Sequence, residues 1–155
     1  MGSAKNYDII RYDDLLLMKA EALIELGRQD ESLPIINQIR DRAAKSTEKL
    51  KKADGSFASK YNIKLYTSAG WTQAYARQAL QWERRLEFAT EGHRFFDLVR
   101  WGIAEQVLNG YITVEKTRRP FLATAKFTAG RDEYLPIPQS EITFTNGLYK
   151  QNPGY

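Results

Sequence analysis

The sequence predicts an all-α domain with a helical-repeat-like architecture: two antiparallel helix pairs, a long loop between them, and an irregular tail wrapped over them. Apolar residues recur at intervals of three and four positions through four segments, as on one face of an α-helix. The two pairs are similar in size, and nothing between them alternates polar and apolar residues as a strand would. We expect helix pairs over 8–45 and 71–109, a loop over 46–70 and a tail over 110–155.

The first pair begins with the most apolar helix, expected over 8–26. Apolar residues cover most of its circumference, which is typical of a central helix that packs on several sides. Gly27 stands where a left-handed residue would end this helix. The second helix can be capped by Asp30 or Ser32, and Pro34 falls in its first turn, where proline is tolerated. Because the connection is short, the two helices should be antiparallel neighbours.

The loop expected over 46–70 is rich in lysine, serine and glycine. Loops of this length inside compact domains are usually functional or disordered. The densest basic cluster of the chain runs from Arg40 to Lys64, with eight lysines and arginines against three acidic residues, in a chain of net charge +4. It shows neither the sharp stripe nor the motif of a nucleic-acid-binding protein, so we interpret it as a solvated face and loop.

The second pair is expected to begin with a helix over about 72–91. Gly92 should interrupt the helical pattern, and a fourth helix should run to Asn109–Gly110. The face of the third helix that we expect to be buried follows a 4-3-4-3 spacing and comprises Tyr75, Ala79, Trp82, Leu86 and Ala89.

The tail changes character after the fourth helix. Prolines in YLPIP exclude a helix there, and the alternation in EITFT indicates extended or turn structure. We expect large apolar side chains to pin this tail onto the helices. The expected pins are Tyr134, Leu135, Ile137 and Phe144.

Composition excludes several classes of protein. No stretch approaches the roughly 18 uninterrupted apolar residues of a transmembrane helix. The chain has no cysteine, which removes disulfides, thiolate metal sites and a cysteine nucleophile. The opening MGSAKN lacks the apolar segment of a signal peptide and is typical of a remnant left by cloning. We therefore expect residues 1–6 to be such a remnant and 7–155 to form one domain.

The segment ERRLEFATEGHRFFDLVRWG, residues 83–102, could be a catalytic site or a structural fastening. No serine-elbow motif accompanies the single histidine, and one histidine without cysteine is a poor zinc site. Glu87 and Glu91 stand beside arginines that would keep them ionised, which does not suit a general acid of glycoside hydrolysis. We therefore predict structural fastening, with no catalytic residue, metal ligand or cofactor.

Helical spacing predicts how this segment is fastened. Opposite charges lie three or four residues apart, where side chains meet on one helix face. The predicted pairs are Arg84–Glu87, Glu91–Arg94, Asp97–Arg100 and His93–Asp97. The structural motif as a whole comprises Glu83, Arg84, Glu91, Gly92, His93, Arg94, Asp97 and Trp101.

The aromatic residues divide into two groups. Tyr75 and Trp82, at helical spacing, are expected to be core residues. Tyr61, Tyr66 and Trp71, in or beside the long loop, could either pack or stack against the apolar faces of sugars, and packing is the favoured interpretation.

The chain resembles one known family in five blocks that occur in the right order between residues 11 and 155. The blocks are RYDDLLLMKAEALIELG, INQIRDRAA, ERRLEFATEGHRFFDLVRWG, YLPIPQSEI and QNPGY. They resemble the C-terminal region of SusD/RagB proteins. The chain departs from the family pattern at Ala44–Lys45, where glycine often stands, and its loop at 46–70 has no counterpart that we can align.

The resemblance implies a scaffold of tetratricopeptide-like helix pairs and a binding protein rather than an enzyme. SusD-like proteins of Bacteroidetes lie on the outer-membrane surface, bind glycans and deliver them to a TonB-dependent transporter of the SusC type. The lipid anchor would belong to an N-terminal part absent from this chain, as would most glycan contacts, and no nucleic acid is implied. Two alternatives stay open: a helical-repeat adaptor for a peptide or protein partner, and, less favoured, a small glycosidase.

Overall fold

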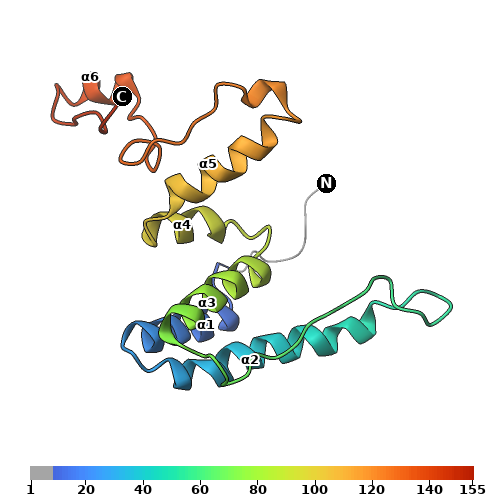
Figure 1. The fold of residues 1–155 in the computed structure, drawn as a ribbon. Helices are drawn as coiled ribbons and strands as arrows, with labels where there is room; N and C mark the ends of the chain where they lie inside the picture. Colours follow the sequence, from blue (N-terminus) through green and yellow to red (C-terminus); the bar gives the residue numbers. More distant parts are fainter. Residues whose placement is uncertain (1–8) are drawn as a thin grey trace. The chain divides into compact units, whose positions relative to one another are not determined.

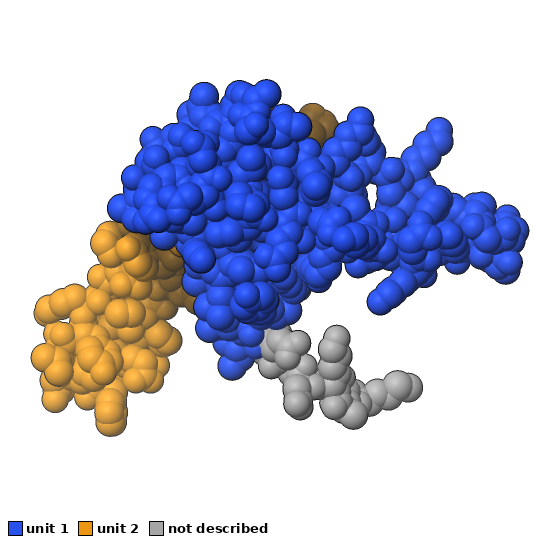
Figure 2. Space-filling model, turned by 90° about the horizontal axis from the view of Figure 1, so that it is seen from below, with its two compact units in different colours: residues 1–91 blue, residues 92–155 orange. Residues whose placement is uncertain are grey.

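The computed structural model describes residues 9–155, and the six residues expected to be a cloning remnant, together with the expected helix start at Asp8, lie outside this part. The described residues form two compact units, one ending at Glu91 and the other comprising Gly92–Tyr155, which Figure 2 colours separately. They contain six α-helices, two short 3-10 helices and a single isolated β-bridge, and no strand (Figure 1). The helices are α1 (Tyr12–Glu25), α2 (Gln29–Ser46), α3 (Gln73–Glu87), α4 (His93–Arg100), α5 (Ala104–Glu115) and α6 (Gln139–Phe144), with η1 (Thr47–Lys49) and η2 (Pro120–Leu122).

Unit 1 is a bundle of α1, α2 and α3 around one apolar core (Figure 1). The first predicted pair is confirmed: α1 and α2 pack together across a connection of three residues, in which Gly27 has a φ of +73°. The expectation that α1 packs on several sides holds for two sides only, because Leu15 and Leu26 remain exposed within the unit. The core comprises Leu17, Ala20, Ile24, Ile36, Ile39, Trp71, Ala76, Ala79, Leu80 and Phe88.

Helix α3 buries a different face from the one expected. The hydroxyl of Thr72 accepts a hydrogen bond from the Tyr75 amide and caps the helix. The buried face carries Glu83 and Arg84, while Trp82 and Leu86 are 54% and 62% exposed. The prediction that Tyr75, Trp82, Leu86 and Ala89 lie in the core is therefore wrong, whereas Ala79 is buried as expected. Hydropathy misassigned the face because two charged residues on it find buried partners.

In unit 2 the single helix expected up to Asn109–Gly110 is two helices. Helix α4 ends at Arg100 and α5 begins at Ala104, and between them Gly102 has a φ of +67°, which favours glycine. Helix α5 then continues through Gly110 to Glu115. The apolar spacing concealed this break because a short turn preserved the approximate helical phase. The small core of unit 2 consists of Leu98, Ala104 and Phe127.

The tail is held by contacts other than those expected. Leu135 and Phe144 are 83% and 84% exposed, and Tyr134 is also exposed, so these residues do not pin the tail within unit 2. Phe127 does so, by entering the core beside α4 and α5. The segment EITFT lies mostly in α6, which corrects the expectation of extended chain. Alternation over five residues is too short to separate a strand from one turn of helix.

Three side-chain amides each hold both backbone groups of one distant residue, an arrangement that we call an amide clamp. Asn37 of α2 donates to the Tyr66 carbonyl and accepts from the Tyr66 amide, both at 2.9 Å. Asn109 of α5 binds Phe127 in the same way at 2.9 and 2.8 Å. Gln151 binds Ile137 likewise. The clamps satisfy loop backbone groups that have no strand to pair with.

Candidate functional site

The fastening predicted from the charged motif is built around Arg11, which precedes α1. Its guanidinium donates two hydrogen bonds to the Glu91 carboxylate, at 2.9 and 3.0 Å, and one each to the carboxylate and the backbone carbonyl of Glu87, at 2.9 and 3.2 Å. These bonds, above all those that Arg11 donates to Glu91, raise the pKa of Arg11. Arg42 of α2 also contacts Glu87, at 2.6 Å. Both carboxylates are thus bound by guanidinium groups.

Two further motif residues join α3 to the other helices of unit 1. Arg84 donates to Asp14 of α1 at 2.8 Å, and each side chain is only 3% exposed. Arg40 of α2 donates to Glu83, and the Tyr66 hydroxyl donates to the same carboxylate at 3.2 Å. Burial raises the pKa of Glu83, an effect that Arg40 opposes. Glu83 and Arg84 therefore bind residues of α2 and α1, and Glu91 binds Arg11 just before α1, whereas the predicted partners were neighbours in the sequence.

The remaining motif residues lie in unit 2. Gly92 has a φ of +84° and directly precedes α4, so a left-handed residue separates the helical segments as expected. The predicted pair of Asp97 and Arg100 is confirmed at 2.9 Å, and the Arg100 guanidinium lies 4.8 Å from the ring centroid of Trp101. His93 and Arg94 are partly buried in the first turn of α4. The pairs proposed between His93 and Asp97 and between Glu91 and Arg94 stay predictions.

The three aromatic residues proposed as possible sugar contacts have different surroundings. Trp71 is 4% exposed, and its indole N–H donates to the Gln29 carbonyl at 2.8 Å. Tyr66 packs against Trp71, with ring centroids 5.3 Å apart, and burial raises its pKa to about 12. Tyr61 is exposed and meets Phe57 edge-on. Packing accounts for Trp71 and Tyr66, and Tyr61 alone presents its ring freely.

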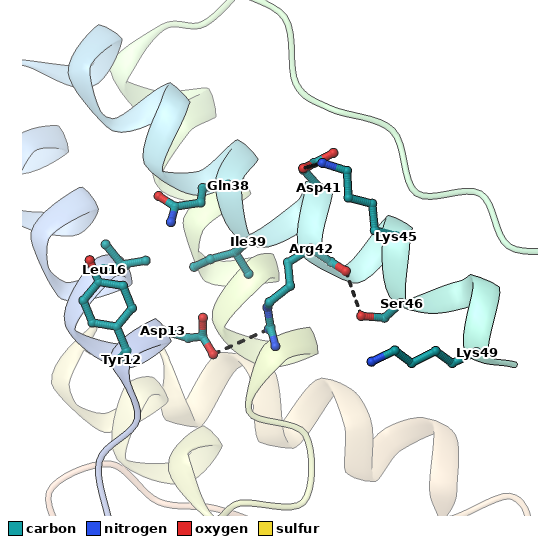
Figure 3. Close-up of a pocket in the computed structure, with 10 residues that line it drawn as sticks. All are labelled: Tyr12, Asp13, Leu16, Gln38, Ile39, Asp41, Arg42, Lys45, Ser46 and Lys49. Atoms are coloured by element: carbon teal, nitrogen blue, oxygen red, sulfur yellow. Dashed lines mark hydrogen bonds and ion pairs between the residues drawn. The ribbon is translucent and has the colours of Figure 1, made fainter.

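A cavity of about 500 Å³ lies between the start of α1 and the end of α2 (Figure 3). Sequence reasoning did not predict this cavity, although the basic residues Arg42, Lys45 and Lys49, at i, i+3 and i+7, could have indicated it. In Figure 3, Arg42 reaches Asp13, whereas Lys49 extends along the lower side of the cavity. The lining residues are Tyr12, Asp13, Leu16, Gln38, Ile39, Asp41, Arg42, Lys45, Ser46 and Lys49. The exposed aromatic ring, the amide and the hydroxyl suit a polar, hydroxylated ligand. Of the cations, Arg42 and Lys45 are paired with Asp13 and Asp41, so Lys49 is the one placed to meet a negative group of such a ligand.

Beside this cavity the end of α2 and the following loop form a basic arm, which we define as residues 45–65. Figures 1 and 2 show it projecting from the helical body of unit 1. A small hairpin forms its tip: Lys51 and Phe57 form an antiparallel bridge, and Gly55 turns the chain with a φ of +80°. Every residue from 48 to 62 is exposed.

The described residues contain no group of three or more histidine, aspartate or glutamate side chains that could hold a metal ion. Within the same part of the chain, no helix is both long enough and apolar enough to cross a bilayer.

Comparison with known proteins gives a consistent result. A family model described as the SusD family matches residues 1–155. SusD-like protein P2 of Formosa agariphila is 31% identical over 99% of this chain and 26% of its own length. SusD-like protein P25 of the same organism is 34% identical over 97% of this chain and 25% of its own length. The chain thus spans about a quarter of these relatives.

Solved structures agree with the sequence matches. A SusD superfamily protein from Bacteroides vulgatus is 36% identical, with a TM-score of 0.70 over 97% of this chain and 28% of its own. A SusD homologue from Bacteroides thetaiotaomicron is 26% identical, with a TM-score of 0.72 over the whole of this chain and 29% of its own. The predicted all-α fold class is confirmed.

Proposed function

The chain belongs to the SusD/RagB family, and from this premise we propose that it is the C-terminal part of a longer, cell-surface glycan-binding protein. The longer protein would be lipid-anchored in the outer membrane, capture oligosaccharides and deliver them to a SusC-type TonB-dependent transporter. The observation that carries this proposal is the family match over the full chain, together with relatives four times as long.

Within that protein, we assign this part a mainly structural role. Its charged motif is used in ion pairs between distant segments of unit 1, and its carboxylates are bound by arginines. The family consists generally of non-catalytic binding proteins, which agrees with this assignment. Glycan contact by Tyr61 and Tyr66 stays a proposal, whereas Trp71 is so deeply packed that a sugar could reach it only after rearrangement.

The proposed function is tested with the complete protein and with the genes that lie beside its own gene. We expect a SusC-type transporter gene beside it, and affinity purification of the complete tagged protein from solubilised outer membranes should recover that transporter. A deletion strain should lose growth on one class of glycan and recover it with the wild-type gene. Recovery of a cytoplasmic peptide-binding complex, with no transporter, would favour the helical-repeat adaptor instead.

Alone, this chain should bind uncharged oligosaccharides weakly. A single sugar stacked on an exposed ring must order the side chain that holds it, and this lowers affinity. We expect dissociation constants in the millimolar range, or about −4 kcal/mol. Calorimetry against uncharged plant, host and microbial oligosaccharides checks this. Micromolar binding that Tyr61→Ala abolishes would place a complete neutral-glycan site within these 155 residues.

A further inference from the structure

The basic arm carries the entire net charge of the chain. Residues 45–65 contain six lysines and two acidic residues, Glu48 and Asp54. The chain has 23 lysines and arginines and 19 acidic residues, so 17 of each sign remain outside the arm. The positive charge is therefore a local property of one projecting segment, and its field should attract anions to that segment.

Most of this charge is not neutralised within the described part of the chain. Lys45 pairs with Asp41, and Lys51 pairs with Glu48 at 2.7 Å. Asp54 is bound by Ser56 at the turn of the hairpin. The lysines of the arm whose ammonium groups have no such partner are Lys49, Lys52, Lys60 and Lys64.

The arm is held to α2 at its return end and folded on itself at its tip. Its return segment is fixed to α2 by the amide clamp of Asn37 on Tyr66 and by a hydrogen bond from Arg40 to the Lys64 carbonyl, at 2.6 Å. At the tip, the rings of Phe57 and Tyr61 meet edge-to-face with centroids 6.1 Å apart. The arm thus carries lysines and an exposed aromatic pair in one segment whose return end is fixed, which lowers the entropy that a ligand must pay to bind there.

We propose that the basic arm and the cavity at its base bind an acidic polysaccharide, one that carries carboxylate or sulfate groups. Lys49 belongs to both features, because it lies on the arm and lines the cavity beside Tyr12 and Ser46 (Figure 3). Ammonium groups pair with the anionic substituents, and aromatic rings stack on the C–H faces of the sugars. This inference rests on the proposed glycan-binding function and specifies its substrate class.

The arrangement favours a polysaccharide over an anionic membrane. The four lysines without such a partner are spread along the arm, from Lys49 at the end of η1 to Lys64 in the returning segment, as a chain-like ligand that follows the arm requires. A flat bilayer would engage one side of the tip only, and Lys51 lies 5.2 Å from the Phe57 centroid, which keeps a charge beside the ring that would have to enter the bilayer.

The test compares charged and uncharged versions of the same polymer. Affinity electrophoresis of this chain would use polygalacturonate against its fully methyl-esterified form, and dextran sulfate against dextran, so that carboxylate and sulfate are distinguished. We expect retardation by at least one acidic polymer only, and a loss of apparent affinity of tenfold or more between about 50 and 300 mM NaCl.

Matched variants assign the binding to the arm. The quadruple variant K49Q/K52Q/K60Q/K64Q should weaken binding at least tenfold. The control K19Q/K116Q/K126Q/K150Q removes the same charge from exposed positions elsewhere and should change binding less than threefold. Phe57→Ala with Tyr61→Ala should weaken the binding that persists at high salt. All these side chains are exposed, and circular dichroism verifies that the variants remain folded.

Several results would overturn the inference. Equal losses in the two quadruple variants would mean binding through net charge alone. Equal retardation by duplex DNA, or equal binding to phosphatidylglycerol vesicles, would mean a general polyanion or a membrane surface. Preference for the uncharged polymers would refute the acidic substrate class and leave the proposed function standing, whereas failure to recover a transporter would refute that function independently.

Discussion

Units 1 and 2 are held together by different kinds of interaction. Unit 1 packs three helices around a core of ten buried apolar residues and joins them by buried ion pairs. Unit 2 has three buried apolar residues in its core, and leaves Leu135, Phe144 and Leu148 about four-fifths exposed. Its tail is fixed mainly by amide clamps and local turns.

This difference indicates which unit can stand alone. Buried apolar area is the dominant favourable term in folding, and hydrogen bonds that replace those to water add little net stability. We therefore expect unit 2 to unfold before unit 1 when this chain is heated or denatured. The large exposed apolar side chains of unit 2 are the kind of surface that interaction sites present.

The largest effect is expected from the buried ion pair of unit 1. Arg84→Met should destabilise unit 1 by about 3–5 kcal/mol, because it leaves the Asp14 carboxylate buried without its partner. The matched control is Arg77→Met, which removes the exposed pair with Glu25 and should cost less than about 1 kcal/mol. Urea denaturation followed by circular dichroism measures both. Equal costs would show that the Asp14 site is accessible to water.

Core truncations compare the two units directly. Leu80 and Leu98 are both 1% exposed, in units 1 and 2 respectively. Leu80→Ala should cost about 3–5 kcal/mol, since the three surrounding helices cannot collapse into the cavity. Leu98→Ala should cost about 2 kcal/mol, at the low end for leucine truncation, because the smaller core of unit 2 can adjust. Hydrogen exchange measures the stability of each unit separately. A larger loss of stability for Leu98→Ala than for Leu80→Ala would mean that the core of unit 2 is the more tightly packed of the two.

Two glycines of unit 2 should respond to alanine with opposite signs. Gly92→Ala should destabilise α4 by about 1 kcal/mol, because a side chain opposes its positive φ even though the space around it is open. Gly110→Ala should stabilise the folded chain by about 0.5–1 kcal/mol, because Gly110 lies inside α5 and the space around it is also open. Thermal unfolding of the two variants measures the difference. A neutral Gly92→Ala would mean that α3 and α4 can join as one helix.

The smallest effect concerns pH and the buried carboxylate of unit 1. Burial raises the pKa of Glu83 in the folded state above its ordinary value of 4.5, so the folded chain holds that proton more tightly than the unfolded chain. The contribution of this tightly held proton to the free energy of unfolding is fully present below about pH 4.5. It is lost as the pH rises through the pKa of Glu83 in the folded state. Acidification from pH 7 to 4.5 should therefore stabilise the wild type relative to Glu83→Gln. The opposite trend would show that Arg40 outweighs desolvation.

Sequence periodicity predicted the helices of unit 1 better than their buried faces. Apolar spacing and Gly27 located α1, α2 and α3, although α1 begins only at Tyr12 and α3 ends at Glu87, before the expected end near Glu91. The buried face of α3 could not be predicted, because burial of Glu83 and Arg84 depends on partners from α1 and α2 that are distant in sequence. Those partners, Asp14 and Arg40, lie 70 and 43 residues away.

In unit 2 and at the candidate site, sequence reasoning missed features that depend on local geometry. The break at Gly102 was visible as a glycine but was outweighed by the spacing of apolar residues around it. The cavity of unit 1 required the end of α2 to lie beside the start of α1, so no single segment revealed it. The basic cluster was recognised, but its lack of counter-charges became evident only once the ion pairs of the arm were known.

The amide clamps recognise a peptide group and not a side chain. Asn37 binds the N–H and C=O of position 66, groups that every residue except proline offers, and loop length itself adds only slowly to the cost of closure. The stretch between α2 and that anchor can therefore be rewritten while its return point stays fixed. Unit 1 is in this respect a display scaffold: a library of foreign peptides grafted between Ser46 and Lys64 would be presented by helices whose own sequence need not change.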